Sequence, residues 1–145
     1  EEVLLGDSLK TVESYLELEK IRLRSRLEYI IDVKGDMGKT YVPGLLIQPL
    51  VENAIKYGIS PSIGGGKISL SISLTEYCTI EVENTGNPWS EKASDSGHGL
   101  INIRQRLGLL YGENWAMEIQ KDSPVMIRIR IPHKADKGVE DELSA

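Results

Sequence analysis

The stretch LVENAIKYG, residues 50–58, places a carboxylate, a carboxamide, an ammonium and a phenol among aliphatic residues. At about 100° per residue, the apolar residues of this region fall on one arc of a helix: Leu46, Ile47, Leu50, Val51, Ala54 and Ile55. Asn53, Lys56 and Tyr57, at i, i+3 and i+4, share the opposite side. The stretch therefore predicts a helix that buries one arc and presents three polar groups on the other.

Length and composition indicate one compact domain. The chain has 145 residues, 40% of them hydrophobic, and a formal charge of −5, which is enough apolar material for a core. Without a long basic run, a general nucleic-acid or anionic-membrane surface is not expected, and any phosphate site must be local. A single cysteine, Cys78, excludes an internal disulfide and favours a reducing compartment such as the cytoplasm. We expect neither a membrane span nor a secretion signal in this chain.

The periodicity of the remaining apolar residues predicts the other elements. Helical spacing indicates a first helix over 8–27, capped by Asp7 or Ser8. The helix of the opening stretch would end at Gly58. A last helix would bury one face through Leu100, Ile103, Leu107 and Leu110. Alternation predicts strands at 27–33, 67–74, 78–84, 115–120 and 125–131, with a hairpin turn at Thr75 to Tyr77.

This order of elements predicts an α/β fold. We expect a two-layer α/β sandwich, with one mixed, mostly antiparallel sheet and about three helices on one face. Strands that pair as hairpins argue against a doubly wound dinucleotide fold. The domain would cover residues 1–133, and the polar, acidic segment 134–145 would be a disordered tail.

The glycine-rich segment ahead of the last helix is a candidate phosphate site. Gly97 and Gly99 flank His98 there, so that backbone amides at a helix N-terminus can approach an anion. The segment lacks the lysine and hydroxyl of a P-loop and the preceding strand of a dinucleotide site. An ordinary turn is the alternative interpretation.

Two asparagines are candidates for nucleotide contacts. Asn84, in VENTG (residues 82–86), ends a strand beside Gly86, and its carboxamide can meet an adenine edge. The oxygen of Asn53 is a hard ligand of the kind that Mg²⁺ accepts beside phosphate oxygens and water. An Asn/Gly turn and a solvated helix face are the respective alternatives.

Taken in order, LVENAIKYG, VENTG and GHGLINIRQRL resemble the N, G1 and G2 boxes of the Bergerat-fold ATPases, which include gyrase, MutL and the sensor histidine kinases. VPGLLIQPLVENAIKYG together with GHGLINIRQRL is similar to the LytS-type sensor histidine kinases. The upstream YLELEKIRLRSRL resembles the helix that precedes the N box in that family. The resemblance extends to about Pro132.

The resemblance implies a role for each motif residue. Asn53 would hold Mg²⁺ that bridges the ATP phosphates, with Lys56 and Tyr57 beside the nucleotide. Asn84 would contact the adenine amine, and Gly86 would leave space for the base. In the G2 box the implied cofactor-binding residues are Gly97, Gly99, Leu100, Asn102 and Arg104, with Arg106 completing the pattern; residues 87–96 would form the ATP lid, in which Trp89 is the one bulky side chain.

The sequence departs from the family pattern at several positions. Asn84 stands where most of the superfamily has an Asp, which implies weaker binding of the base because Asn is neutral. Pro49 occupies the position of the water-activating Glu of gyrase-type enzymes, so we expect little hydrolysis. Glu52 is then a candidate catalytic residue that polarises the acceptor histidine, or else a surface charge.

The resemblance implies that the chain is the ATP-binding catalytic domain of a two-component sensor histidine kinase, with ATP and Mg²⁺ as cofactors. It would transfer the γ-phosphoryl group to a histidine on a separate phosphoacceptor and dimerisation domain, because neither His98 nor His133 lies in a phosphoacceptor motif. A response regulator would act downstream of a membrane-attached homodimer, with this domain on the cytoplasmic side of a bacterial inner membrane. A non-catalytic nucleotide sensor and an anti-sigma-factor-like serine kinase are the alternatives.

Overall fold

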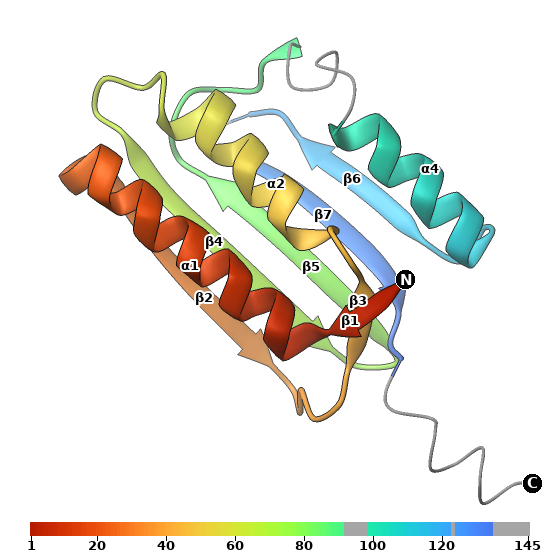
Figure 1. Cartoon of the computed structure of the whole chain (residues 1–145). Helices are drawn as coiled ribbons and strands as arrows, with labels where there is room; N and C mark the ends of the chain where they lie inside the picture. Colours follow the sequence, from red (N-terminus) through yellow and green to blue (C-terminus); the bar gives the residue numbers. More distant parts are fainter. Residues whose placement is uncertain (92–98, 123, 135–145) are drawn as a thin grey trace, which may run out of the picture.

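The computed structural model describes residues 1–91, 99–122 and 124–134 (Figure 1). A five-stranded sheet has the order β2-β4-β5-β7-β6, with bounds Leu27–Lys34 (β2), Gly66–Leu74 (β4), Tyr77–Asn84 (β5), Ala116–Gln120 (β6) and Val125–Pro132 (β7). Three helices, α1 (Leu5–Leu23), α2 (Ile47–Ala54) and α4 (Gly99–Tyr111), lie on one face of it. The expected two-layer α/β sandwich is confirmed.

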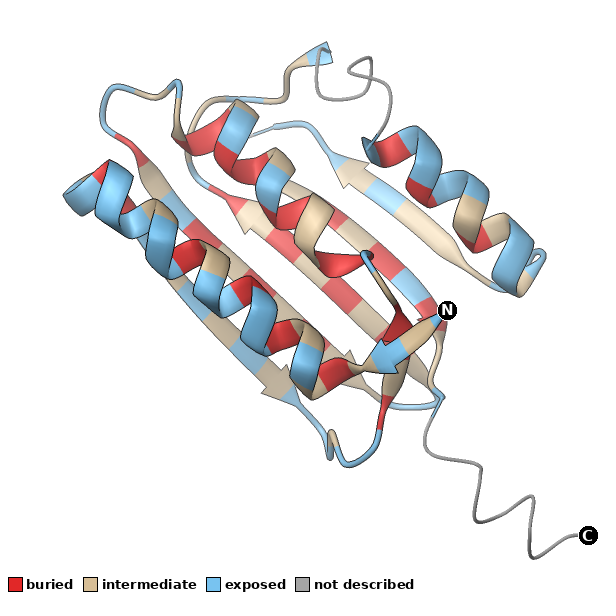
Figure 2. Cartoon of the chain, viewed as in Figure 1, coloured by how far each residue is buried: buried red, intermediate tan, exposed pale blue. Residues whose placement is uncertain are grey.

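Strand pairing gives the sheet its mixed character. β2 runs parallel to β4, and the other neighbouring pairs are antiparallel. β4 and β5 form the expected hairpin, with Leu74 opposite Cys78. On β5 the residues alternate in burial, and the inward row continues through the neighbouring strands as Leu70 opposite Val82. This row and the buried helix faces form one core (Figure 2).

Helix α1 begins earlier than predicted. It starts at Leu5, and neither Asp7 nor Ser8 caps it, because no side chain bonds to its first amides. The Leu5 amide instead donates to the carbonyl of Thr40 at 2.8 Å. A short strand pair, β1 (Glu2–Leu4) with β3 (Tyr41–Pro43), brings these segments together. The helix ends where Arg24 has a φ of 56°, followed by a 3₁₀ turn, η1 (Arg24–Arg26).

The opening stretch forms α2 and a π-helical turn, η2 (Ile55–Ile59). All six residues of the apolar arc are buried, as predicted. The helical segment does not end at Gly58 but continues one residue further. A Cβ at Gly58 would collide with the side chain of Asn84, so this glycine permits close packing on β5.

The last helix differs at one predicted core position. Leu100, Ile103 and Leu107 are buried, whereas Leu110 is 45% exposed. Tyr111 packs against the core in its place. Burial of the ring raises the pKa of Tyr111 to about 12.

The expected tail is described only at its first residue. Lys134 pairs with Tyr41 as an isolated bridge, and its Nζ lies 2.8 Å from a carboxylate oxygen of Glu2. Residues 135–145 lie outside the described part of the chain. Among the described residues, no helix is both long and apolar enough to cross a bilayer.

Candidate nucleotide site

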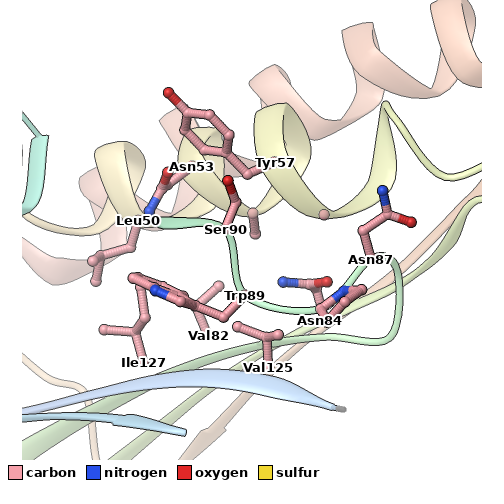
Figure 3. Close-up of a pocket in the computed structure, with 13 residues that line it drawn as sticks. Leu50, Asn53, Tyr57, Val82, Asn84, Asn87, Trp89, Ser90, Val125 and Ile127 are labelled. Carbon is pink, nitrogen blue, oxygen red and sulfur yellow. The ribbon is translucent and has the colours of Figure 1, made fainter. Parts of the chain in front are cut away.

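Three distant parts of the chain line one pocket between α2 and the sheet (Figure 3). Asn53 and Tyr57 come from the helix side, and Asn84 comes from the end of β5. The family resemblance implies a metal contact for Asn53, a place beside the nucleotide for Tyr57 and a base contact for Asn84. The structure brings all three to one place, with side chains from the segment after β5 between them.

Asn84 lies in this pocket because of the strand period. Successive inward residues of β5 are Cys78, Ile80, Val82 and Asn84, so the carboxamide ends an apolar row and is only 6% exposed. Its Oδ1 accepts a hydrogen bond from the Gly86 amide at 3.1 Å. A buried carboxamide is costly without such a partner, so this bond fixes the orientation of the group.

Strand β7 supplies the apolar wall of the pocket. Val125 is the register partner of Asn84, and Ile127 is the partner of Val82. All four side chains line the pocket. A flat apolar ligand group can therefore lie against β5 and β7 while its polar edge meets Asn84.

A second hollow adjoins the first through Asn53 and Tyr57, which line both. Its other lining residues are Pro49, Glu52, Lys56, Gly99 and Leu100. The Lys56 Nζ lies 5.2 Å from the centroid of the Tyr57 ring, so a cation stands at this end of the site. Gly99 begins the 13-residue helix α4, whose N-terminus favours an anion.

The site offers few oxygen atoms for a metal ion, so most of the metal's ligands would have to come from the bound molecule and from water. Among the described residues, no group of three His, Cys, Asp or Glu side chains is arranged to hold a metal ion. Asn53, partly exposed between the two hollows, supplies one neutral oxygen. Mg²⁺ commonly binds with one or two protein oxygens, several waters and substrate phosphates, and this donor set fits that pattern.

Glu52 faces the second hollow rather than the first. Its Oε2 accepts a hydrogen bond from Gln48 Nε2 at 3.1 Å. Burial raises the pKa of Tyr15 on α1. The charge of the Glu19 carboxylate and the hydrogen bond to it raise this pKa further, and the charge of Glu52 adds to the rise. Glu52 therefore lies on the side of α2 that faces α1 and the open hollow, away from the base pocket.

Not all predicted site residues line these hollows. Gly86 packs against the backbone of Gly58, where a Cβ would overlap the carbonyl group. Asn102 and Arg104 are exposed on α4, beyond the lining of either hollow. Gly97 lies outside the described residues.

Several residues that line the pocket carry no site signal of their own in the sequence. The sequence pattern assigns Leu50 only to the buried arc and Ile127 only to a strand, while the resemblance marks the segment around Val125 as the place where many relatives carry a Gly-Thr pair that helps bind adenine. The alternating pattern of 125–131 shows that Val125 and Ile127 share a face, but the register that places Val125 beside Asn84 is not readable from it. Trp89 was noted as bulky, yet no pattern predicted that its indole would enter the pocket.

Comparisons with known proteins find sensor histidine kinases among both the sequence relatives and the solved structures of the same fold. The chain is 30% identical over 133 residues to the sensor histidine kinase BtsS of Escherichia coli K12, covering 90% of this chain and 24% of that protein. It is 29% identical to the sensor protein LytS of Oceanobacillus iheyensis, covering 94% of this chain and 26% of LytS. The catalytic domain of histidine kinase ThkA superposes with a TM-score of 0.67 at 18% identity, over 91% of this chain and 94% of that domain.

The chain is a sensor histidine kinase homologue with the histidine kinase catalytic-domain fold. No protein-family model matches it. This kinase-like domain spans about a quarter of the length of the curated sensor kinases that it matches. ThkA has also been solved in complex with the response regulator TrrA, and that kinase superposes with a TM-score of 0.61 over 92% of this chain and 42% of its own.

Proposed function

We propose that this domain binds MgATP and transfers the γ-phosphoryl group to a histidine on a separate phosphoacceptor domain. The observation that supports this most strongly is the meeting of Asn53, Tyr57 and Asn84 around one pocket, which adjoins the second hollow at the N-terminus of α4. The apolar wall suits a purine, and the adjoining hollow, with Lys56 and the helix N-terminus, suits phosphates.

In this proposal each part of the chain binds or positions one part of the ligand. Asn84 contacts the base edge through its carboxamide, and Asn53 holds Mg²⁺ together with phosphate oxygens and water. Mg²⁺, when bound, neutralises charge on the phosphates. Lys56 adds positive charge near the phosphates, and Glu52, which lines the second hollow, orients an incoming histidine.

The relatives support the partners that we propose. The acceptor would be the phosphoacceptor and dimerisation domain of the same full-length kinase, with a response regulator downstream, as the ThkA–TrrA complex suggests. We place the domain, residues 1–133, on the cytoplasmic side of a membrane-attached homodimer, where ATP is available. Gly86, Gly97, Gly99, Leu100, Asn102 and Arg104 remain proposed nucleotide contacts.

Titration calorimetry with ADP and with ATP, each with Mg²⁺, tests the binding step. Asn53→Ala should abolish the Mg²⁺-dependent part of the affinity, while Asn114→Ala, which removes an exposed carboxamide remote from the lining residues, should leave it unchanged. Unchanged affinity in Asn53→Ala would remove Asn53 from the metal site.

Labelled ATP and a phosphoacceptor domain added in trans test the transfer step. An acid-labile phosphoryl group on the acceptor supports the histidine kinase. An acid-stable phosphoserine supports the serine kinase instead, and binding without transfer supports a nucleotide sensor.

A further inference from the structure

The indole of Trp89 lies inside the pocket assigned to the purine. Figure 3 shows it between Leu50 on the helix side and Val82 and Ile127 on the sheet side. It is partly buried and packs against the core. With the indole there, the open volume of the pocket is about 20 Å³, which is room for about one water molecule. A purine is several times larger than a water molecule, so the two rings cannot share this space.

The indole is not fully satisfied in this position. Its Nε1 is buried and has no hydrogen-bond partner among the described residues. A buried donor without an acceptor opposes the burial of the ring. Trp115 provides the contrast, because its Nε1 donates to the carbonyl of Gly112 at 2.9 Å. The packing of Trp89 is thus favourable for its carbon atoms and unfavourable for its nitrogen.

Two contacts link the Trp89 segment to the loop after β6. The Trp89 amide donates to the carbonyl of Lys121 over 3.5 Å, at the long limit for a hydrogen bond. The neighbouring Glu91 carboxylate lies 3.6 Å from Lys121 Nζ, with both side chains more than half exposed. Exposed ion pairs contribute little stability, so these contacts do not hold the indole firmly.

We propose that Trp89 is the affinity-determining residue of the base pocket, because its indole takes the place of the purine and leaves when nucleotide binds. This inference rests on the proposed nucleotide function. It predicts that the free protein exists mainly with the ring inside and that binding competes against this packing. The measured affinity is then lowered by the fraction of molecules in which the pocket is open.

The experiment uses Trp115→Phe protein, in which Trp89 is the sole tryptophan, titrated with Mg²⁺-ADP. Free protein should show blue-shifted emission and weak acrylamide quenching. Saturation should shift the emission to the red and strengthen quenching, with the same midpoint as calorimetry. Calorimetric saturation without a change in Trp89 emission or quenching would overturn the inference and leave the proposed function intact.

Two substitutions complete the test. Trp89→Ala should tighten ADP binding on the order of tenfold if the open form is a minor state, and Trp89→Leu should give a smaller gain with apolar packing retained. Weaker binding in both variants, with circular dichroism unchanged, would mean that the indole stacks on the base, and would overturn the inference. No calorimetric binding to any of these proteins would refute the nucleotide function itself, and this inference with it.

Discussion

Gly86→Ala distinguishes two reasons for a glycine at the edge of the site. The family resemblance assigns Gly86 to leaving space for the base. In the structure, a Cβ at this position would lie 2.6 Å from the carbonyl carbon of Gly58 and 3.2 Å from the Ile59 amide nitrogen. Both are backbone atoms, so no rotamer change can relieve the overlap. The backbone of η2 or of the segment after β5 must move.

The cost follows from this geometry. Overpacking that shifts backbone costs about 1–3 kcal/mol. For a chain of this size about 1 kcal/mol lowers the melting temperature by roughly 3 °C, so Gly86→Ala should lower it by about 3–9 °C. The Asn87 amide, which donates to the Gly58 carbonyl at 2.8 Å, would lose its alignment as well. ADP affinity should fall too, since the Gly86 amide orients Asn84.

Urea denaturation followed by circular dichroism measures the free energy of unfolding. Gly108→Ala is the matched control, because it lies inside α4 and a Cβ there meets nothing within 4 Å. It should stabilise the protein by roughly 0.5–1 kcal/mol. A Gly86→Ala protein with wild-type unfolding energy and weakened ADP binding would refute the packing argument and support the space-for-base role.

Three further predictions concern stability alone. Arg106→Leu removes the donors to the carbonyls of Gly44 and Leu45, and urea denaturation should show a loss of about 1.5–3 kcal/mol; no loss would mean that water replaces the guanidinium. Gly6→Ala should raise the melting temperature, because Gly6 lies in α1 with open space around it, and a decrease would contradict this. Burial raises the pKa of the Cys78 thiol to about 12 in the folded protein, from an ordinary value of about 8.5. The buried neutral thiol therefore contributes its full stability below the ordinary pKa, and this contribution is lost as the pH rises toward the pKa of the folded protein. Cys78→Ala should therefore lessen the fall in unfolding free energy between about pH 8.5 and 10, and an unchanged slope would contradict it.

Regular periodicity explains what the sequence could predict. The apolar arc of α2 and the alternation along β4 and β5 repeat over several turns or residues, and each repeat buries a side chain. Such patterns specify which face of an element is buried before any partner is known. Few arrangements bury one face of a sheet together with the apolar faces of three helices, so these patterns favour the two-layer architecture.

Contacts between distant residues explain what the sequence could not predict. The start of α1 depends on a hydrogen bond from Leu5 to Thr40, and three-residue strands such as β1 carry no periodic signal. At the end of α4, Leu110 fits the helical period but is 45% exposed, and the partly buried Tyr111 packs against the core instead. The position of the Trp89 side chain depends on the pairing of β5 with β7, because residues of both strands line its pocket. The local sequence after β5 carries no information about that pairing.

Position 84 is where the demands of the sheet and of the site meet. An aliphatic residue there would continue the inward row of β5, yet the chain has a carboxamide, which needs a partner when buried. Gly58 makes room for that group, and Gly86 both donates to it and packs against Gly58. These three residues join η2 to the end of β5, so a change at any of them should alter stability and nucleotide affinity together. Trp89 is not one of these three residues. Removing its indole should open the pocket and raise nucleotide affinity while the contacts among Gly58, Asn84 and Gly86 stay in place, so at this position affinity and stability should not fall together.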